Sequence, residues 1–258
     1  MKLSVETTGN GPDLVLLHGW GMNGAVWSPV LDSLSRDFRI SVIELPGHGL
    51  SGYDPNWTDL DSWVEACLRA APAKATWIGW SLGGQLAQRA ALMAPDRIEG
   101  LVLVTASPRF VAGEGWPHAM ALNTLMQFAR ALSRDHHQTL ERFLSLQVQG
   151  DEAARETLRL LRQDIALRPE ADPLALEQGL ELLRTVDLRP GLGDIRCPTL
   201  WLFGERDTLV PADVCDELER LMPAAEILIL QGCAHAPFLS HPRPCLRALK
   251  HFLGSDHA

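Results

Sequence analysis

Three residues that are far apart in the chain have the side chains of a nucleophile, an acid and a base. Ser81, Asp207 and His235 each lie just after an apolar run of the kind that forms a buried strand. A serine hydroxyl is a weak nucleophile at neutral pH. A histidine can take its proton during attack, and an aspartate can orient the imidazole and stabilise its charged form. The three residues therefore predict catalysis by Ser81, with His235 as general base and Asp207 as its acid partner.

The serine lies in a segment that predicts a sharp turn from a strand into a helix. In Gly79-Trp80-Ser81-Leu82-Gly83 the glycines stand two positions before and after the serine, where a Cβ atom would collide in such a turn. The turn holds the serine in a strained conformation and directs a helix N-terminus towards its hydroxyl. A serine between glycines is more often part of an ordinary loop, so this interpretation depends on the residues that accompany it.

Attack on a carbonyl needs hydrogen-bond donors for the oxyanion that forms, and two backbone N–H groups are candidates. Leu82 directly follows the nucleophile, and its amide is the first donor. We assign the second to the amide of Trp20, because His18-Gly19 lets the chain turn tightly after the apolar run 14–17. Each such donor is worth roughly 2.7–4 kcal/mol of the reaction barrier.

Each of these residues also has a plainer interpretation. An aspartate in an Arg-Asp-Thr sequence is typical of a turn or a helix cap, and a histidine near the C-terminus, such as His241, is usually structural. Glu205 and Asp187 are rival acids, but Glu205 lies too close to its strand and Asp187 precedes it. The position of Ser81, Asp207 and His235 after strands, in that order, favours catalysis and is typical of the α/β-hydrolase fold.

The elements that must position these residues alternate along the chain. Strands are predicted at 3–8, 14–17, 40–45, 76–79, 101–104, 199–203 and 226–230. Helical patterns between them predict a mostly parallel sheet with helices on both faces. The β-like runs stop between 110 and 185, where helices are predicted near 117–132, 135–148, 151–167 and 173–185. We therefore predict an α/β-hydrolase core of residues 1–109 and 186–258, with a helical lid of residues 110–185.

Composition excludes several classes of protein. The formal net charge of −9 argues against nucleic acid as a partner. The five cysteines are scattered and form no C-x-x-C pair, which argues against a disulfide framework or a zinc site. The sequence has no apolar stretch near the ~20 residues that a membrane span needs. We expect a soluble cytoplasmic monomer that needs no cofactor and no metal.

Four segments carry a more specific resemblance. They are Leu17-His18-Gly19-Trp20-Gly21-Met22-Asn23, Gly79-Trp80-Ser81-Leu82-Gly83-Gly84, Val186-Asp187-Leu188-Arg189 and His235-Ala236-Pro237-Phe238-Leu239-Ser240-His241-Pro242. With these segments the chain resembles the pimeloyl-[acyl-carrier protein] methyl ester esterases of biotin synthesis along nearly its full length. The resemblance implies hydrolysis of the methyl ester of a pimeloyl chain held on acyl carrier protein, with release of methanol.

The same resemblance implies roles for residues of the predicted lid. The segment 141–147 matches the family's lid helix, and Phe143 and Gln147 lie one helical turn apart in it. With Trp20 and Leu82 they are the expected substrate-binding residues, although Phe143 can equally be part of the lid core.

Contact with the carrier protein is expected from Arg142, Arg155 and Arg159. Cationic side chains of this kind can pair with acidic residues or with a phosphate. A solvated helix face is the alternative, because acidic residues are interleaved with these arginines. Gln138 stands where the resemblance leads us to expect a further arginine.

Two other functions remain open at this stage. The same triad serves general short-chain carboxylesterases and C–C bond hydrolases that act on free small substrates. A hydrolase fold can also serve as a binding protein without catalysis, although the complete triad argues against this. Haloalkane dehalogenases and epoxide hydrolases are disfavoured, because they have an aspartate where this chain has Ser81.

Overall fold

A mostly parallel β-sheet forms the centre of the molecule. The computed structural model describes residues 2–254, and in this range seven strands form one sheet in the order β1-β3-β2-β4-β5-β6-β7. The edge strand β1 (Val5–Thr8) runs antiparallel to β3 (Arg39–Ile43), and the other neighbouring strands are parallel. The predicted sheet is confirmed.

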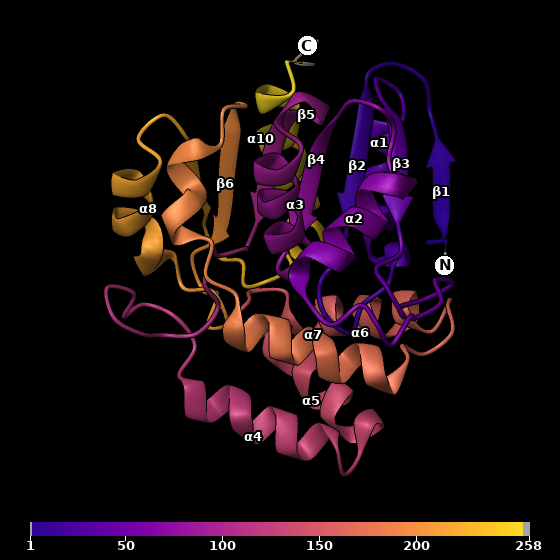
Figure 1. Cartoon of the computed structure of the whole chain (residues 1–258), viewed down its shortest axis with the longest axis vertical. Helices are drawn as coiled ribbons and strands as arrows, with labels where there is room; N and C mark the ends of the chain where they lie inside the picture. Colours follow the sequence, from indigo (N-terminus) through magenta and orange to yellow (C-terminus); the bar gives the residue numbers. More distant parts are fainter. Residues whose placement is uncertain (1, 255–258) are drawn as a thin grey trace.

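The central strands are almost completely buried. These are β2 (Asp13–Leu17), β4 (Ala75–Trp80), β5 (Ile98–Val104) and β6 (Thr199–Gly204). Their continuous apolar runs arise because helices cover both faces of a parallel sheet. The edge strand β7 (Glu226–Leu230) is mostly exposed. In Figure 1, α2 (Leu60–Ala70) and α3 (Leu82–Met93) lie in front of the sheet, and α10 (Pro242–Phe252) lies behind it with α1 (Ser28–Leu34).

Some helices differ from the sequence-based expectation. The pattern at 23–34 predicts one helix, but the chain forms the 3-10 turn η1 (Gly24–Trp27) before α1, because Asn23 caps η1 and a proline starts α1. The pattern at 211–221 likewise divides into η4 (Ala212–Val214) and α8 (Cys215–Leu221). The short elements η2 (Pro95–Arg97), η3 (Arg189–Asp194) and α9 (Pro237–Ser240) have too few residues to give a periodic signal.

The predicted helical insert is present as four consecutive helices in the described residues. They are α4 (Leu122–Leu132), α5 (His136–Gln147), α6 (Ala154–Ile165) and α7 (Pro173–Thr185). Figure 1 shows them together beyond the carboxyl ends of the parallel strands. Asp135 caps α5 and Asp172 caps α7, each by accepting a backbone N–H. The division of the chain at residues 110 and 185 stays our proposal.

The helices of residues 2–254 include none that is long and apolar enough to cross a membrane.

Candidate active site

Ser81 lies in the turn between β4 and α3. Its backbone has φ 54° and ψ −116°, in the left-handed region that a non-glycine residue seldom adopts. The Ser81 N–H donates to the Val104 carbonyl on the neighbouring strand β5, at 3.0 Å. A Cβ atom on Gly79 would lie 2.4 Å from the Gly83 carbonyl oxygen. The turn therefore needs glycine at position 79, and it directs a single serine to the carboxyl end of the sheet.

Asp207 and His235 form a buried pair. The Nδ1 atom of His235 lies 2.6 Å from Oδ2 of Asp207, and both side chains are at most 1% exposed. The carboxylate orients the ring and keeps the proton on Nδ1, which leaves Nε2 free to accept a proton. Nε2 is buried and has no hydrogen-bond partner among the described residues. An imidazole nitrogen that is free to accept a proton is what a general base requires.

The backbone of His235 is bonded to the turn of residues 79–83, which we call the elbow, and to Thr105, directly after β5. Its carbonyl oxygen accepts the indole N–H of Trp80 at 2.7 Å and the hydroxyl of Thr105 at 2.8 Å. Trp80 directly precedes Ser81, and Thr105 follows β5 with a positive φ of 40°. Sequence reasoning missed both contacts, because neither residue carries a local signal of a partner more than 100 positions away. The two bonds hold the histidine beside the elbow.

The peptide between Gly19 and Trp20 has a defined direction. The Gly19 carbonyl accepts from Nδ1 of His18 at 2.9 Å and from the Met22 N–H at 3.3 Å. Because a trans peptide is planar, the Trp20 N–H must point the opposite way. A Cβ atom on Gly19 would lie 3.3 Å from Cβ of Ser81, so this peptide packs against Ser81. His18 thus orients one of the two amides that sequence reasoning assigned to the oxyanion.

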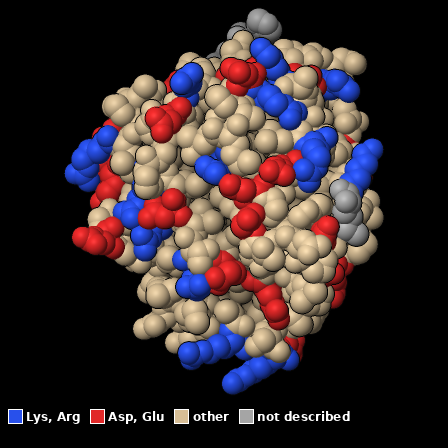
Figure 2. All heavy atoms as spheres, viewed as in Figure 1, with Lys and Arg blue, Asp and Glu red and all other residues tan. Residues whose placement is uncertain are grey.

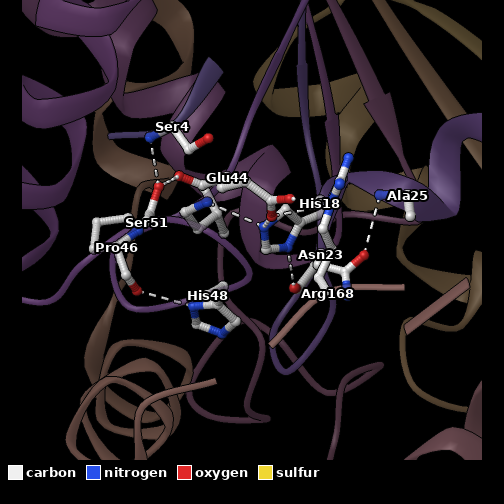
Figure 3. Close-up of polar contacts among 12 residues, drawn as sticks. Ser4, His18, Asn23, Ala25, Glu44, Pro46, His48, Ser51 and Arg168 are labelled. Atoms are coloured by element: carbon white, nitrogen blue, oxygen red, sulfur yellow. Dashed lines mark hydrogen bonds and ion pairs between the residues drawn. The ribbon is translucent and has the colours of Figure 1, made fainter. Parts of the chain in front are cut away.

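Two further buried side chains hold the same loop (Figure 3). Nε2 of His48 accepts the Gly21 N–H at 3.2 Å, and its Nδ1 faces the Pro46 carbonyl at 2.9 Å. Glu44 accepts the Gly24 N–H at 3.0 Å. Burial lowers the pKa of His48 to about 3, so its Nε2 stays an acceptor at neutral pH.

The lid helices α5 and α7 rest directly on Trp20. The Trp20 indole N–H donates to the Leu176 carbonyl of α7 at 2.8 Å, and its ring meets Phe143 of α5 edge-on at 4.8 Å between centroids. A Cβ atom on Gly179 would lie 2.6 Å from Cδ1 of Trp20. Leu82, the other expected oxyanion residue, is the first residue of α3 and is fully buried. The lid therefore packs on the loop that contains Trp20, and a Cβ atom on Gly179 would also lie 3.6 Å from Leu82.

The two lid residues that were expected to bind substrate lie close to this site. Phe143 packs between Trp20 and Phe128, the latter at 6.1 Å between ring centroids. Gln147 is 1% exposed, and its side-chain carbonyl oxygen has no hydrogen-bond partner in the part of the chain that is described. Its backbone carbonyl accepts the His235 N–H at 3.0 Å. The Gln147 side chain therefore offers an unused acceptor near the base.

A groove of about 460 Å³ opens between α4 and α5. Phe128, Thr139, Arg142 and Leu146 are among its lining residues. Phe128 also contacts Phe143, which contacts Trp20. A row of aromatic side chains thus leads from the groove to the loop beside Ser81.

The three arginines expected to contact a carrier differ in their surroundings. Arg159 is exposed but is bonded on its own helix to Glu156 at 2.9 Å and to Gln163 at 2.7 Å. Arg142 and Arg155 are exposed, and Arg142 also lines the α4–α5 groove. The arginine pattern therefore leaves Arg142 best placed at the rim of a route to Ser81.

The rival acids have other partners. Asp187 pairs with Arg189 at 2.6 Å and with Arg109 at 2.9 Å. The hydrogen bond from Arg189 lowers the pKa of Asp187, against the opposing effect of burial. Glu205 accepts the Gly232 N–H at 2.9 Å. Within residues 2–254, no group of three or more His, Cys, Asp or Glu side chains is arranged to hold a metal ion.

Comparison with known proteins places this chain among its relatives. A model of the α/β-hydrolase fold family matches residues 12–242. An esterase from Exiguobacterium antarcticum has the same fold, with a TM-score of 0.89 and 21% sequence identity, over 98% of this chain and 96% of that one. The pimeloyl-[acyl-carrier protein] methyl ester esterase of Photobacterium profundum is 44% identical over 96% of this chain and 97% of its own length. The pimeloyl-[acyl-carrier protein] methyl ester esterase of Nitrosomonas europaea is 44% identical over 93% of this chain and 95% of its own length.

The sheet, the elbow and the family match together define an enzyme of the α/β-hydrolase family. More narrowly, the chain belongs to the pimeloyl-[acyl-carrier protein] methyl ester esterases.

Proposed function

We propose that this chain is a serine carboxylesterase that hydrolyses the methyl ester of pimeloyl-acyl carrier protein in biotin synthesis. The full-length similarity to esterases of that name supports the substrate. The carrying structural observation is the buried Asp207–His235 pair, bonded through the His235 carbonyl to the residue before Ser81. The expected cytoplasmic location, the monomeric state and the independence from cofactors are part of this proposal.

The mechanism follows from the geometry. The Ser81 hydroxyl attacks the ester carbonyl while Nε2 of His235 takes its proton, and Asp207 stabilises the imidazolium that forms. The amides of Trp20 and Leu82 donate to the oxyanion. Collapse of the intermediate expels methoxide, which leaves as methanol with the proton from His235. Water then attacks the acyl-enzyme while His235 takes its proton. His235 returns that proton to the Ser81 oxygen as the pimeloyl carboxylate leaves.

The lid supports a substrate that is tethered to a protein. A linear acyl chain needs an apolar route, and the Phe128–Phe143–Trp20 row provides one from the α4–α5 groove. Arg142 at this groove can meet an acidic carrier or a phosphate group. Figure 2 shows acidic and basic side chains interspersed over this face of the molecule. Basic side chains lie at the lower end of the molecule, where Figure 1 places the lid helices. We propose Arg142, Arg155 and Arg159 as carrier contacts, with Phe143 and Gln147 contacting the acyl chain.

The test compares two substrates on the same enzyme. We expect the kcat/KM for methyl pimeloyl-acyl carrier protein to exceed that for free monomethyl pimelate by at least about tenfold, since the carrier adds binding energy that the free ester lacks. Methanol release reports both reactions.

The Ser81→Ala variant is the control, and it should show no turnover of either substrate. The wild-type gene should restore growth without biotin to a bacterial strain that lacks its own esterase. Equal efficiency on both substrates would contradict the carrier-specific function and favour a general short-chain carboxylesterase.

A further inference from the structure

The connection between α5 and α6, residues 148–153, is bonded to the loop that carries His235. The His235 N–H donates to the Gln147 carbonyl at 3.0 Å, and the Glu152 N–H donates to the Gly232 carbonyl at 3.0 Å. Between these two bonds, the Ala234 N–H donates to Oδ2 of Asp151 at 2.9 Å. The lid thus makes three hydrogen bonds to residues 232–235, which we call the histidine loop.

Asp151 is the only one of these partners whose side chain makes the bond. Its carboxylate is buried, with the residue 8% exposed. The second oxygen, Oδ1, accepts the Ala153 N–H at 2.7 Å, just before α6 begins. One carboxylate therefore joins Ala153, the residue before α6, to Ala234, the residue before His235. Neither the proposed mechanism nor the sequence motifs use it.

The histidine loop is held from two sides. On the core side, Trp80 and Thr105 donate to the His235 carbonyl. On the lid side, Gln147 accepts the His235 N–H and Asp151 accepts the Ala234 N–H. Loss of the Asp151 carboxylate would leave the buried Ala234 N–H without its acceptor, which favours a shift of the loop. A shift of about 1 Å at a catalytic group can cost on the order of 100-fold in rate, because proton transfer needs hydrogen-bond reach.

We propose that Asp151 is a positioning residue that aligns His235 with Ser81 when the lid is seated on the core. This inference rests on the proposed role of His235 as the general base. The lid then does more than cover the site, because its α5–α6 connection completes the alignment of the base.

The competing explanation is that Asp151 only holds the turn before α6, and a matched variant separates the two. Asp135 caps the neighbouring lid helix α5 by accepting the Gln138 N–H at 2.9 Å, and it is exposed. Asp135→Ala removes a lid cap without removing a bond to the histidine loop. Asp151→Ala removes a hydrogen bond of the turn before α6 together with the bond to Ala234.

The measurement is kcat and KM for p-nitrophenyl butyrate, a small ester whose turnover does not depend on a carrier protein. We expect Asp151→Ala to lower kcat about tenfold with KM unchanged within about twofold, because only the alignment of the base is affected. Asp151→Asn keeps one acceptor oxygen for the two N–H groups that Asp151 binds, so its kcat should lie between those of Asp151→Ala and the wild type. Asp135→Ala should lower the Tm by a similar amount and leave kcat unchanged. Complete labelling with a fluorophosphonate counts the reactive Ser81 in each preparation, so that rates are expressed per folded site.

The proposal is overturned if Asp151→Ala keeps the wild-type kcat per labelled site, or if Asp135→Ala loses as much. If Asp151→Ala does not fold, Asp151→Asn decides: a lowered kcat at constant KM supports the proposal, and a wild-type kcat overturns it. Ser81→Ala separates this inference from the proposed function. If that variant keeps activity, the proposed site is wrong, whereas an inactive Ser81→Ala with unaffected Asp151 variants overturns the positioning role alone.

Discussion

The two oxygens of the Asp207 carboxylate have different partners. Oδ2 faces Nδ1 of His235, and Oδ1 accepts the N–H groups of Leu209 and Val210 at 2.8 and 3.0 Å. The backbone donors fix the carboxylate, and the carboxylate in turn fixes the imidazole. A neutral amide of the same shape would keep the packing but not the charge. The charge of Asp207 can therefore be removed by a substitution that leaves the volume of the side chain unchanged.

Asp207→Asn should lower kcat by about 10³–10⁴-fold with little change in KM. The amide oxygen can stay with the two backbone donors, and its NH₂ group would then face Nδ1 and force the ring proton onto Nε2, where it blocks proton transfer. Steady-state hydrolysis of p-nitrophenyl butyrate measures the loss. Asp187→Asn is the control and should keep kcat within about twofold, because its partners are Arg109 and Arg189. A comparable loss in Asp187→Asn would mean that the acid has been wrongly chosen.

Helix α7 bears directly on the loop that supplies one proposed oxyanion donor. The Leu176 carbonyl of α7 accepts the indole N–H of Trp20, and Gly179 of the same helix leaves room for the indole ring. The position of α7 and the position of Trp20 are thus coupled through contacts that leave no space for an added methyl group. At the scale of elements, the lid and the loop of residues 18–22, which we call the oxyanion loop, pack together as one unit.

Gly179→Ala should lower kcat about tenfold, because the new methyl group would lie 2.6 Å from Cδ1 of Trp20 and must displace the ring or the helix. The Tm should change little, since alanine is favoured over glycine inside a helix by about 1 kcal/mol and this offsets part of the strain. Enzyme kinetics and thermal melting of the same preparations measure the two effects. Gly193→Ala, where the nearest atom to the new group is 4.0 Å away, should leave kcat unchanged. Equal kcat in both variants would contradict the coupling.

At the scale of the whole molecule, folding buries two imidazoles where water cannot reach them. His18 and His48 are both fully buried at the oxyanion loop, and each accepts a backbone N–H at Nε2. Burial lowers the pKa of His48 to about 3. The unfolded chain, in contrast, binds a proton at this residue below about pH 6.5. Acid therefore favours the unfolded state, and the free energy of unfolding falls as the pH drops from about 6.5 towards 3, by at most about 1.4 kcal/mol per pH unit from this residue.

His48→Gln should flatten the dependence of stability on pH between about 6.5 and 4. The amide does not titrate, and its oxygen can still accept the Gly21 N–H, so the variant should fold with a lower stability at pH 7. Urea unfolding at pH 7 and pH 5 measures the slope. The exposed His137 serves as control, and His137→Gln should follow the wild type. The explanation fails if His48→Gln loses as much stability between the two pH values as the wild type does.

Much of the fold could be predicted because its signals are local. Apolar runs predict buried strands, 3.6-residue periodicity predicts helices, and glycines flanking a serine predict a sharp turn. Since parallel strands end at one edge of a sheet, Ser81, Asp207 and His235 were expected to converge, and the structure does bring Asp207 and His235 into contact. Helices were predicted at 23–34 and 211–221, but not the division of each into a 3-10 turn and an α-helix. At 23–34, the Asn23 cap and the proline in the first turn of α1 override the periodicity.

By itself, then, the sequence determined the parallel sheet, the elbow, the order of the three candidate residues and the four helices of the insert. Only the tertiary structure decided which groups hold them. Trp80 bonds to a carbonyl 155 positions away, and Asp151 bonds to an amide 83 positions away. Such bonds depend on how the lid and the sheet pack, and packing joins residues without regard to their separation in the chain. The direction of the Trp20 amide and the alignment of His235 are therefore properties of the folded molecule.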